Sequence, residues 1–170
     1  MSEVLSDELR SLGYPVISAE EKAVVSEGNM QDVMQMNFAL RMANRVLLHL
    51  RSFNAPHPKQ VYKKIKAIAW ERFLSGNGYF SVDSFVSNQF IRDTRFANLV
   101  IKDAIVDRMQ EQLGKRPDTG PDKSYAVIFV YWYGDLCEVY FDTSGETLTR
   151  HGYRENPWKA PLQENLAAGL

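Results

Sequence analysis

The sequence predicts a mixed α+β fold that is divided into two units. Stretches in which apolar residues recur at helical spacing alternate along the chain with short runs of strand-like pattern. Hydrophobic residues make up 45% of the 170 residues, which suffices for the cores of two small domains. A segment with two prolines at 56–58 separates the two groups of elements. These three observations indicate two successive α+β units.

The first unit is predicted to be ferredoxin-like. Its expected elements, in chain order, are a helix over 3–12 that ends at Gly13, strands over 14–18 and 23–26, a helix over 30–43 and a strand over 45–53. One more strand before Met1 would complete the βαββαβ order of a ferredoxin-like unit. We therefore expect a ferredoxin-like unit over residues 1–55 whose first strand is missing.

The helix over 30–43 carries a methionine-rich face. Its apolar side is expected to contain Met30, Val33, Met34, Asn37, Phe38 and Met42. Flexible methionine side chains commonly fill irregular cores, so this face is expected to pack inside the first unit.

The second unit is predicted to be an α/β layer unit over residues 56–155. Its expected elements are a helix over 59–74, a strand over 79–87, a long helix over 94–113 that Asp93 or Thr94 caps, and strands over 125–133 and 136–143. Gly134 and Asp135 suit a two-residue turn between the last two strands. The unbroken apolar run YAVIFVYWY is typical of a central strand that is buried on both faces.

Composition excludes several classes of protein. The single cysteine, Cys137, rules out an intramolecular disulfide and lies in an apolar strand, where a buried thiol is expected. No apolar run reaches the roughly 20 residues of a membrane span, and no signal sequence is present, so a cytoplasmic protein without membrane contact is expected.

No catalytic or metal-binding pattern is present in the sequence. His49, His57 and His151 are far apart and have no metal-ligand spacing. The segment DTSG at 142–145 has no recognisable general base, and SGNG at 75–78 is a turn rather than a phosphate loop. We therefore predict no catalytic residue, no metal site and no cofactor of its own for this chain.

Basic residues form the candidate site. Residues 1–36 carry seven acidic and two basic residues, whereas residues 37–74 carry eight basic residues and one acidic residue. Such a distribution indicates one basic face on a body whose formal net charge is only −1. The candidate RNA-binding residues are Lys59, Lys63, Lys64, Lys66, Arg92, Arg95, Lys102, Arg116, Arg150 and Arg154.

Two of these candidate RNA-binding features have simpler explanations. The lysine-bearing helix face could be merely solvated, and Lys102 with Asp103 is expected to be an ion pair at the edge of a layer. Tyr153 and Trp158 are available to stack on exposed bases.

Five segments resemble one bacterial methyltransferase family in their order and spacing. They are MQDVMQMNFALRMANRVLLHL, FSVDSF, RFANLVIKDAIVDRMQEQLGKRP, FDTSGETLTRHGYR and KAPLQENLAAGL. The chain resembles the amino-terminal part of the THUMP-containing ribosomal RNA large-subunit methyltransferases, a family catalogued also as N(6)-adenine-specific DNA methylases. One departure lies in LTRHGYR, where His151 replaces a base.

The resemblance implies a ferredoxin-like unit, a THUMP domain that binds RNA, and then a Rossmann-like methyltransferase domain. It implies that residues 156–170 are a linker and the first helix of that catalytic domain, whose cofactor loop and catalytic motif would lie beyond Leu170. Ribosomal RNA and the carboxy-terminal methyltransferase domain are the implied partners. The parent protein would use S-adenosylmethionine to methylate a guanine N(2) of 23S ribosomal RNA, and this part alone would not be an enzyme.

Two other functions stay open at the level of sequence. The parent protein could modify DNA adenine or transfer RNA, because the choice of base would be made in the catalytic domain. The chain could also be a non-enzymatic interaction module, in which the apolar hairpin around 127–133 packs against a protein partner.

Overall fold

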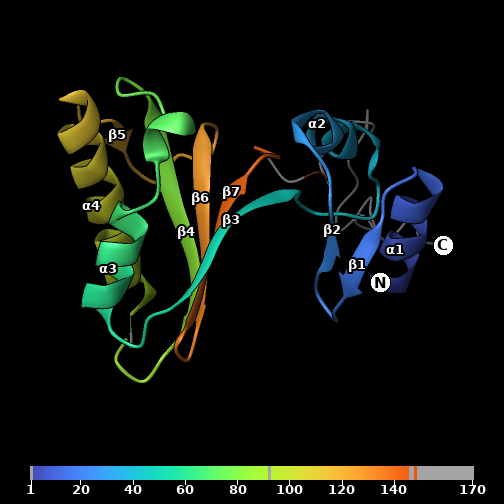
Figure 1. Ribbon diagram of the computed structural model, residues 1–170, viewed down its shortest axis with the longest axis horizontal. Coiled ribbons are helices and arrows are strands. Elements are labelled where there is room, and N and C mark those ends of the chain that lie inside the picture. The colour runs from blue at the N-terminus through green and yellow to red at the C-terminus, as the bar shows by residue number, and fades with distance from the viewer. Residues whose placement is uncertain (1, 92, 146–147, 149–170) are drawn as a thin grey trace, which may run out of the picture. The chain divides into compact units, whose positions relative to one another are not determined.

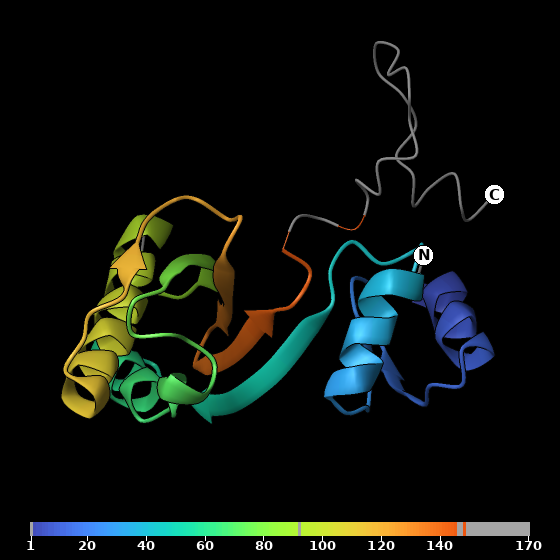
Figure 2. The same cartoon turned by 90° about the horizontal axis from the view of Figure 1, so that it is seen from above.

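The computed structural model describes residues 2–91, 93–145 and 148. The chain forms two compact units: unit 1 comprises Met1–Val46 with Glu146–Leu170, and unit 2 comprises Leu47–Gly145. The division after Val46 lies earlier than residue 55, where the sequence placed it. Figures 1 and 2 show the elements of each unit.

Unit 1 has the helix–hairpin–helix order that the sequence predicted. It contains α1 (Ser2–Ser11), β1 (Val16–Ala19), β2 (Val24–Ser26) and α2 (Met30–Ala39), and its two strands pair antiparallel. Its buried core consists of Leu9, Met36, Leu40, Ala43 and Leu148.

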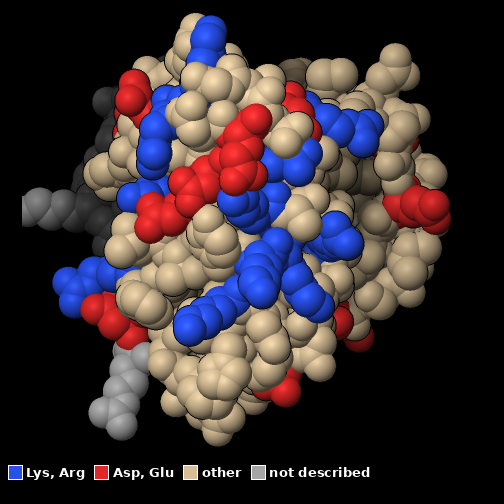
Figure 3. All heavy atoms as spheres, turned by 60° about the vertical axis from the view of Figure 1, so that its left-hand side comes forward, with Lys and Arg blue, Asp and Glu red and all other residues tan. Residues whose placement is uncertain are grey.

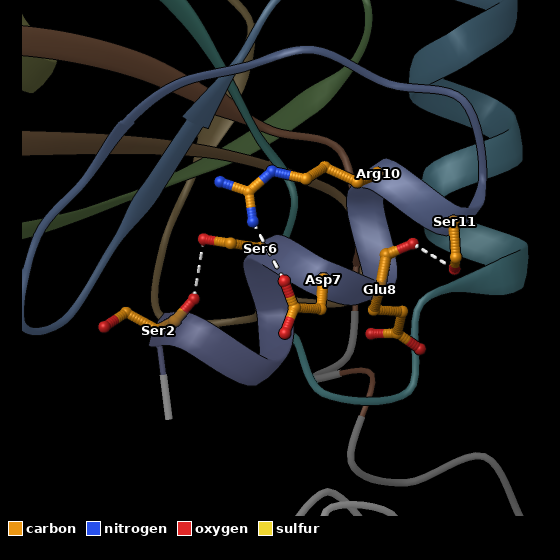
Figure 4. Close-up of polar contacts among 6 residues, drawn as sticks. All are labelled: Ser2, Ser6, Asp7, Glu8, Arg10 and Ser11. Atoms are coloured by element: carbon orange, nitrogen blue, oxygen red, sulfur yellow. Dashed lines mark hydrogen bonds and ion pairs between the residues drawn. The ribbon is translucent and has the colours of Figure 1, made fainter.

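Polar contacts along α1 stabilise the helix and tie it to the end of α2. Asp7 and Arg10 form an ion pair at 2.9 Å, three residues apart on one face of the helix (Figure 4). The carboxylate of Glu8 accepts hydrogen bonds from the backbone N–H groups of Arg41 and Met42, at 2.9 and 3.1 Å. Glu8 thereby fixes the segment that follows α2 against α1.

The prediction of a buried methionine-rich face over 30–43 is confirmed for Val33 and Met42, which are 9% and 7% exposed, but was wrong for Met30, Met34 and Phe38. Met30, Met34 and Phe38 are 59%, 63% and 91% exposed, whereas Val33 and Met36 are buried. Because α2 is apolar on two neighbouring faces, the sequence could not decide which face would be covered. The helix is also shorter than expected, since Leu40 already has an extended backbone conformation.

The strand predicted to close the first unit belongs to unit 2. It is β3 (Leu47–Asn54), which pairs antiparallel with β7 (Leu136–Asp142) along its whole length. The pairing is interrupted by a β-bulge between His49 and Arg51. Periodicity identified the strand correctly, but the partner of a strand depends on distant residues that local pattern does not identify.

Unit 2 is built on a five-stranded mixed sheet with the order β3-β7-β6-β4-β5. Its remaining strands are β4 (Tyr79–Ser87), β5 (Asp118–Thr119) and β6 (Ala126–Tyr133). β4 runs parallel to β5 and β6, whereas β6 and β7 pair antiparallel through the turn predicted at 134–135. The short β5 lies between α4 and β6, where the sequence predicted no helix or strand.

Helices α3 (Pro58–Lys66) and α4 (Thr94–Leu113) cover one face of this sheet (Figures 1 and 2). The predicted bounds and cap of α4 are confirmed: the Asp93 carboxylate accepts from the backbone N–H of Arg95 at 2.9 Å, and Gly114 ends the helix with φ 65°. Within the described part of the chain, no helix is both long and apolar enough to cross a membrane.

The helix predicted over 59–74 ends earlier, at Lys66, and a 3₁₀ turn follows at Trp70–Arg72. The carbonyl of Ile65 accepts from the backbone N–H of Ile68 at 3.1 Å and from the indole Nε1 of Trp70 at 2.8 Å. These bonds occupy an acceptor that a continuing α-helix would use, so the chain turns there and buries Trp70.

The two faces of β6 differ in burial. Ile128, Val130 and Trp132 are buried beneath the helices. On the opposite face Phe129 and Tyr131 are half-buried, and Tyr133 is 58% exposed. The strand is central, as predicted. Its outer face is buried at Val127, which is 1% exposed, but becomes more exposed towards Tyr133, so the expectation that both faces are buried was wrong for the aromatic residues of that face.

The topology of unit 2 gathers several chain ends at one edge of the sheet. β3, β4 and β6 run in the same direction, so their carboxyl ends meet at one edge. The N-termini of α3 and α4 follow β3 and β4 at this edge. Asn88 links the surrounding loops, because its Nδ2 donates to the carbonyls of Pro56 and Gly134 at 3.2 and 2.5 Å.

Candidate nucleic-acid interface

Helix α3 presents three lysines to solvent. Pro58 stands at the start of the helix, and Val61 and Ile65 face the core of unit 2. This placement leaves Lys59, Lys63 and Lys64 exposed on the outer surface. Lys and Arg side chains gather on the helix-covered side of unit 2, as Figure 3 shows.

Lys63 and Lys64 border an open hollow of about 390 Å³. The hollow is lined by Asn54, Pro56, Gln60, Lys63 and Lys64. The Lys64 Nζ also lies 5.6 Å from the centre of the Phe53 ring, a cation–π contact that leaves its charge available. Among the described residues, no carboxylate is within ion-pair distance of Lys59, Lys63 or Lys64. The sequence did not single out Asn54 and Gln60, because only the fold brings them beside the lysines.

Lys66 differs from the other lysines of α3. Its Nζ donates to Glu111 on α4 at 2.6 Å, and this hydrogen bond raises the pKa of Lys66. One turn earlier, the hydroxyl of Tyr62 donates to Asp107 at 2.6 Å, which raises the pKa of Tyr62. Lys66 is therefore part of the contact between α3 and α4, and its charge is already neutralised.

A further ion pair joins the 3₁₀ turn to α4. Arg108 donates to both carboxylate oxygens of Glu71, at 2.6 and 3.2 Å, and both side chains are mostly buried. These hydrogen bonds hold the pKa of Glu71 below its ordinary value. The geometry is that of a structural pair rather than of a free anion-binding group.

Two other candidates have acidic partners on their own helix. The guanidinium of Arg95 pairs with the capping carboxylate of Asp93 at 2.8 Å, and the hydrogen bonds from Arg95 lower the pKa of Asp93. Lys102 lies 3.3 Å from Asp103, so the expected ion pair is confirmed. The side chain of Arg95 is still 91% exposed, which leaves it accessible to solvent.

The remaining candidates are not brought to the lysines of α3 by any described contact. Arg116 is exposed in the loop after α4. Arg92, Arg150 and Arg154 lie outside the described residues. The same holds for Tyr153, Trp158 and the linker and helix expected over 156–170. The described site is thus smaller than the predicted one and centres on α3.

The other reactive side chains of the described residues have structural surroundings. Burial raises the pKa of the Cys137 thiol to about 12, and its predicted burial is confirmed. The Nε2 atom of His49 is hydrogen-bonded to the hydroxyl of Ser52 at 2.8 Å. The ring of His57 packs on the ring of Phe90, with 4.0 Å between the ring centres. No group of three or more His, Cys, Asp or Glu side chains within the described part could hold a metal ion.

Family models match both parts of the chain. The model of the RlmL ferredoxin-like domain matches residues 1–47, and the model of the THUMP domain matches residues 57–142, just over half of the chain. Both are α+β domains, in agreement with the predicted fold class.

Curated relatives match nearly the whole chain. Ribosomal RNA large subunit methyltransferase K/L of Syntrophotalea carbinolica is 34% identical over 98% of the chain, and that of Pseudomonas aeruginosa is 33% identical over all of it. The chain spans only 23% of the length of either relative.

Solved structures share the fold over nearly the full chain. A protein described as a predicted N6-adenine-specific DNA methylase, from Listeria monocytogenes, superposes with a TM-score of 0.87 at 28% identity, covering 99% of this chain and 44% of that one. SMU.472, assigned as a methyltransferase and complexed with SAH, superposes with a TM-score of 0.83 at 28% identity, covering 98% and 44%. By these matches the chain belongs to the THUMP-domain family, and it is similar over nearly its whole length to part of the ribosomal RNA large subunit methyltransferases K/L.

Proposed function

We propose that this chain is the RNA-binding portion of a ribosomal RNA methyltransferase in the cytoplasm. In the longer protein, a carboxy-terminal domain would use S-adenosylmethionine to methylate guanine N(2) of 23S ribosomal RNA. The chain's role is positional: it holds folded RNA so that the catalytic domain reaches its target base.

The observation that carries the proposal is the lysine cluster of α3, which consists of Lys59, Lys63 and Lys64. A lysine that is paired to a carboxylate contributes little to the affinity for a phosphate, because the existing ion pair must first be broken. The lysine cluster has no such competitor among the described residues and borders a hollow with amide groups from Asn54 and Gln60. Ammonium and amide donors together are suited to phosphate oxygens.

Two hollows formed by the described residues do not fit S-adenosylmethionine. The hollow beside α3 is lined by lysine, amide and proline side chains, and a second hollow of about 220 Å³ is lined by Ser75, Gly78, Pro117 and mainly apolar or aromatic residues. Neither offers a carboxylate for ribose hydroxyls or a glycine-rich loop for the cofactor's charged end. We therefore derive no catalytic step from these residues.

Binding to a 23S ribosomal RNA fragment, titrated over a series of salt concentrations, tests the proposal. If the lysine cluster contacts phosphates, the affinity falls with salt at a log–log slope of roughly 0.7 to 0.9 per neutralised phosphate. Three lysines give a slope between about −2 and −3. An affinity that does not change with salt would contradict the proposal.

Two single substitutions, each of which removes one positive charge from α3, test whether the RNA-binding site lies on this helix. Lys63→Ala is expected to weaken binding and to reduce the salt slope by roughly 0.7 to 1. Lys66→Ala is the matched control, since it removes the same charge from the same helix but from a lysine held by Glu111. We expect Lys66→Ala to change the slope less. Equal binding by the parent protein and Lys63→Ala would remove α3 from the interface.

Competition with DNA and with transfer RNA separates the remaining substrates. A 23S fragment that is displaced only weakly by either competitor supports ribosomal RNA as the partner. Preferential binding of duplex DNA or transfer RNA at equal salt would instead assign the parent protein to that nucleic acid.

A further inference from the structure

The face of the unit 2 sheet opposite α3 and α4 carries an aromatic row, formed by Phe85, Tyr131 and Tyr133. Phe85 on β4 and Tyr131 on β6 are register partners, and their rings lie 5.2 Å apart and 10° from parallel. Tyr133 follows two residues later on the same face, 6.4 Å from Tyr131 and 13° from parallel. The three rings are therefore nearly parallel to one another, and each stacks on the next in a continuous row.

Both ends of the aromatic row are open to solvent. Phe85 is 49% exposed and Tyr133 is 58% exposed, and Leu136, the register partner of Tyr133, is 47% exposed. Single exposed apolar residues are common on protein surfaces, but aligned rings on adjacent strands form a contiguous patch of the kind that marks interaction sites. Exposed aromatic rings on a sheet are also side chains on which unpaired bases stack.

The aromatic row ends close to the lysine cluster. Tyr133 pairs with Leu136, and Leu136 pairs with Asn54, which lines the hollow beside Lys63 and Lys64. Tyr133 and Asn54 are thus two strands apart in one cross-strand row, a distance of about 10 Å. The backbone N–H of Ala55 also donates to the carbonyl of Asp135 at 2.6 Å, so the hollow and the turn after Tyr133 are held together.

The charges near the row suit bases rather than phosphates. Asp83 is neutralised by Lys123 at 2.6 Å. Glu138, the register partner of Tyr131, accepts a hydrogen bond from Ser52 at 3.2 Å. A carboxylate would repel phosphate, but it can accept from the exocyclic amine of a stacked base. The positive charge that phosphates need lies at the hollow instead.

We propose that unit 2 binds an unpaired RNA strand across the edge of the sheet at which β3, β4 and β6 end. The phosphates would lie at the lysine cluster and the bases would stack on the aromatic row. This inference rests on the proposed function and adds to it the structural class of the RNA: single-stranded rather than duplex. A duplex hides its base faces, so only an unpaired strand gains the stacking contribution.

Substitution of the rings by leucine tests the inference in the full chain. Tyr131→Leu and Tyr133→Leu keep the surface apolar but remove the ring face. Each is expected to weaken binding of a single-stranded 23S fragment by about 5-fold to 100-fold, the range for loss of one stacked base, with no change in salt slope. Binding of a duplex of equal length is expected to stay the same. Tyr125→Leu is the matched control, because Tyr125 is 59% exposed and lies before β6, outside the aromatic row.

The outcomes separate this inference from the proposed function. If Lys63→Ala weakens binding and the ring variants do not, the aromatic row is not part of the RNA site, although the proposed function stands. If neither kind of variant changes RNA affinity, both fail. Equal weakening of single-stranded and duplex RNA would also overturn stacking. Unchanged RNA affinity with altered self-association in gel filtration would assign the row to a protein contact, and circular dichroism melting checks that each variant is folded.

Discussion

Cys137 shows how strongly burial controls a single side chain. It lies in β7 beneath the helices with no exposed surface, and burial raises the pKa of its thiol to about 12. Because the thiolate is the reactive form, the folded protein is expected to resist a thiol reagent at pH 8. Absorbance measurements with Ellman's reagent should show no reaction until denaturant is added. Rapid labelling of the folded chain would contradict this burial.

Glu71 links one ion pair to the pH dependence of stability. Arg108 holds the pKa of Glu71 below its ordinary value. The ion pair therefore contributes its full stabilisation at a pH above the ordinary pKa of a glutamate. This stabilisation is lost as the pH falls through the lowered pKa of Glu71. Glu71→Gln is expected to lower the melting temperature at pH 7 by about 2 to 4 °C. The difference from the parent should shrink in acid. A difference of equal size at pH 7 and pH 3 would show that charge is not the cause, and Asp103→Asn, in a more exposed pair, is the control.

The lysines of α3 show what can be predicted for single residues. Composition and spacing located a basic helix correctly, since lysines at 59, 63, 64 and 66 leave Val61 and Ile65 for the core. The sequence could not separate Lys66 from the others. Its partner Glu111 lies 45 positions away, and the two meet only because α3 and α4 pack side by side. The local sequence therefore predicts where the positive charges lie on α3, but it does not predict which of them are neutralised by a distant carboxylate.

At the level of elements, α2 has one face that packs and one that does not. Met36→Ala is expected to destabilise unit 1 by about 2 to 5 kcal/mol, because it leaves a cavity in the small core. Phe38→Ser should change stability little, since Phe38 is 91% exposed. Chemical denaturation of the two variants measures this contrast. A larger effect from Phe38→Ser would mean that this face is covered in solution.

Most elements could be predicted from periodicity, and the errors share one cause. The bounds of α4, the strands β4 and β6, and the turn after Tyr133 follow from local spacing and capping residues. The early end of α3 and the transfer of β3 to the second sheet do not. The first depends on the indole of Trp70 bonding to Ile65, and the second on pairing with β7, which is more than eighty residues away in sequence. Both are tertiary contacts that override local preference.

For the whole molecule, the two units differ in the number of chain segments that form them. Unit 2 is one continuous segment that contains every strand of its sheet and its own buried core. Unit 1 combines two distant segments, and Leu148 from the second segment is buried in its core. The backbone N–H of Leu148 also donates to the carbonyl of Asn44 at 2.9 Å. Unit 2 therefore has what a domain needs to fold alone, whereas residues 1–46 lack part of their core.

This difference predicts the behaviour of the separated segments. Residues 47–145 alone are expected to melt in one cooperative transition and to retain the salt-dependent RNA binding of the full chain, because both the lysine cluster and the aromatic row lie within them. Residues 1–46 alone should melt at lower temperature or without a cooperative transition, since Leu148 is missing from their core. Circular dichroism melting of both segments, with RNA titration of the first, measures these properties. If residues 47–145 fold but do not bind RNA, the site must include residues of unit 1, and an interface confined to unit 2 is excluded.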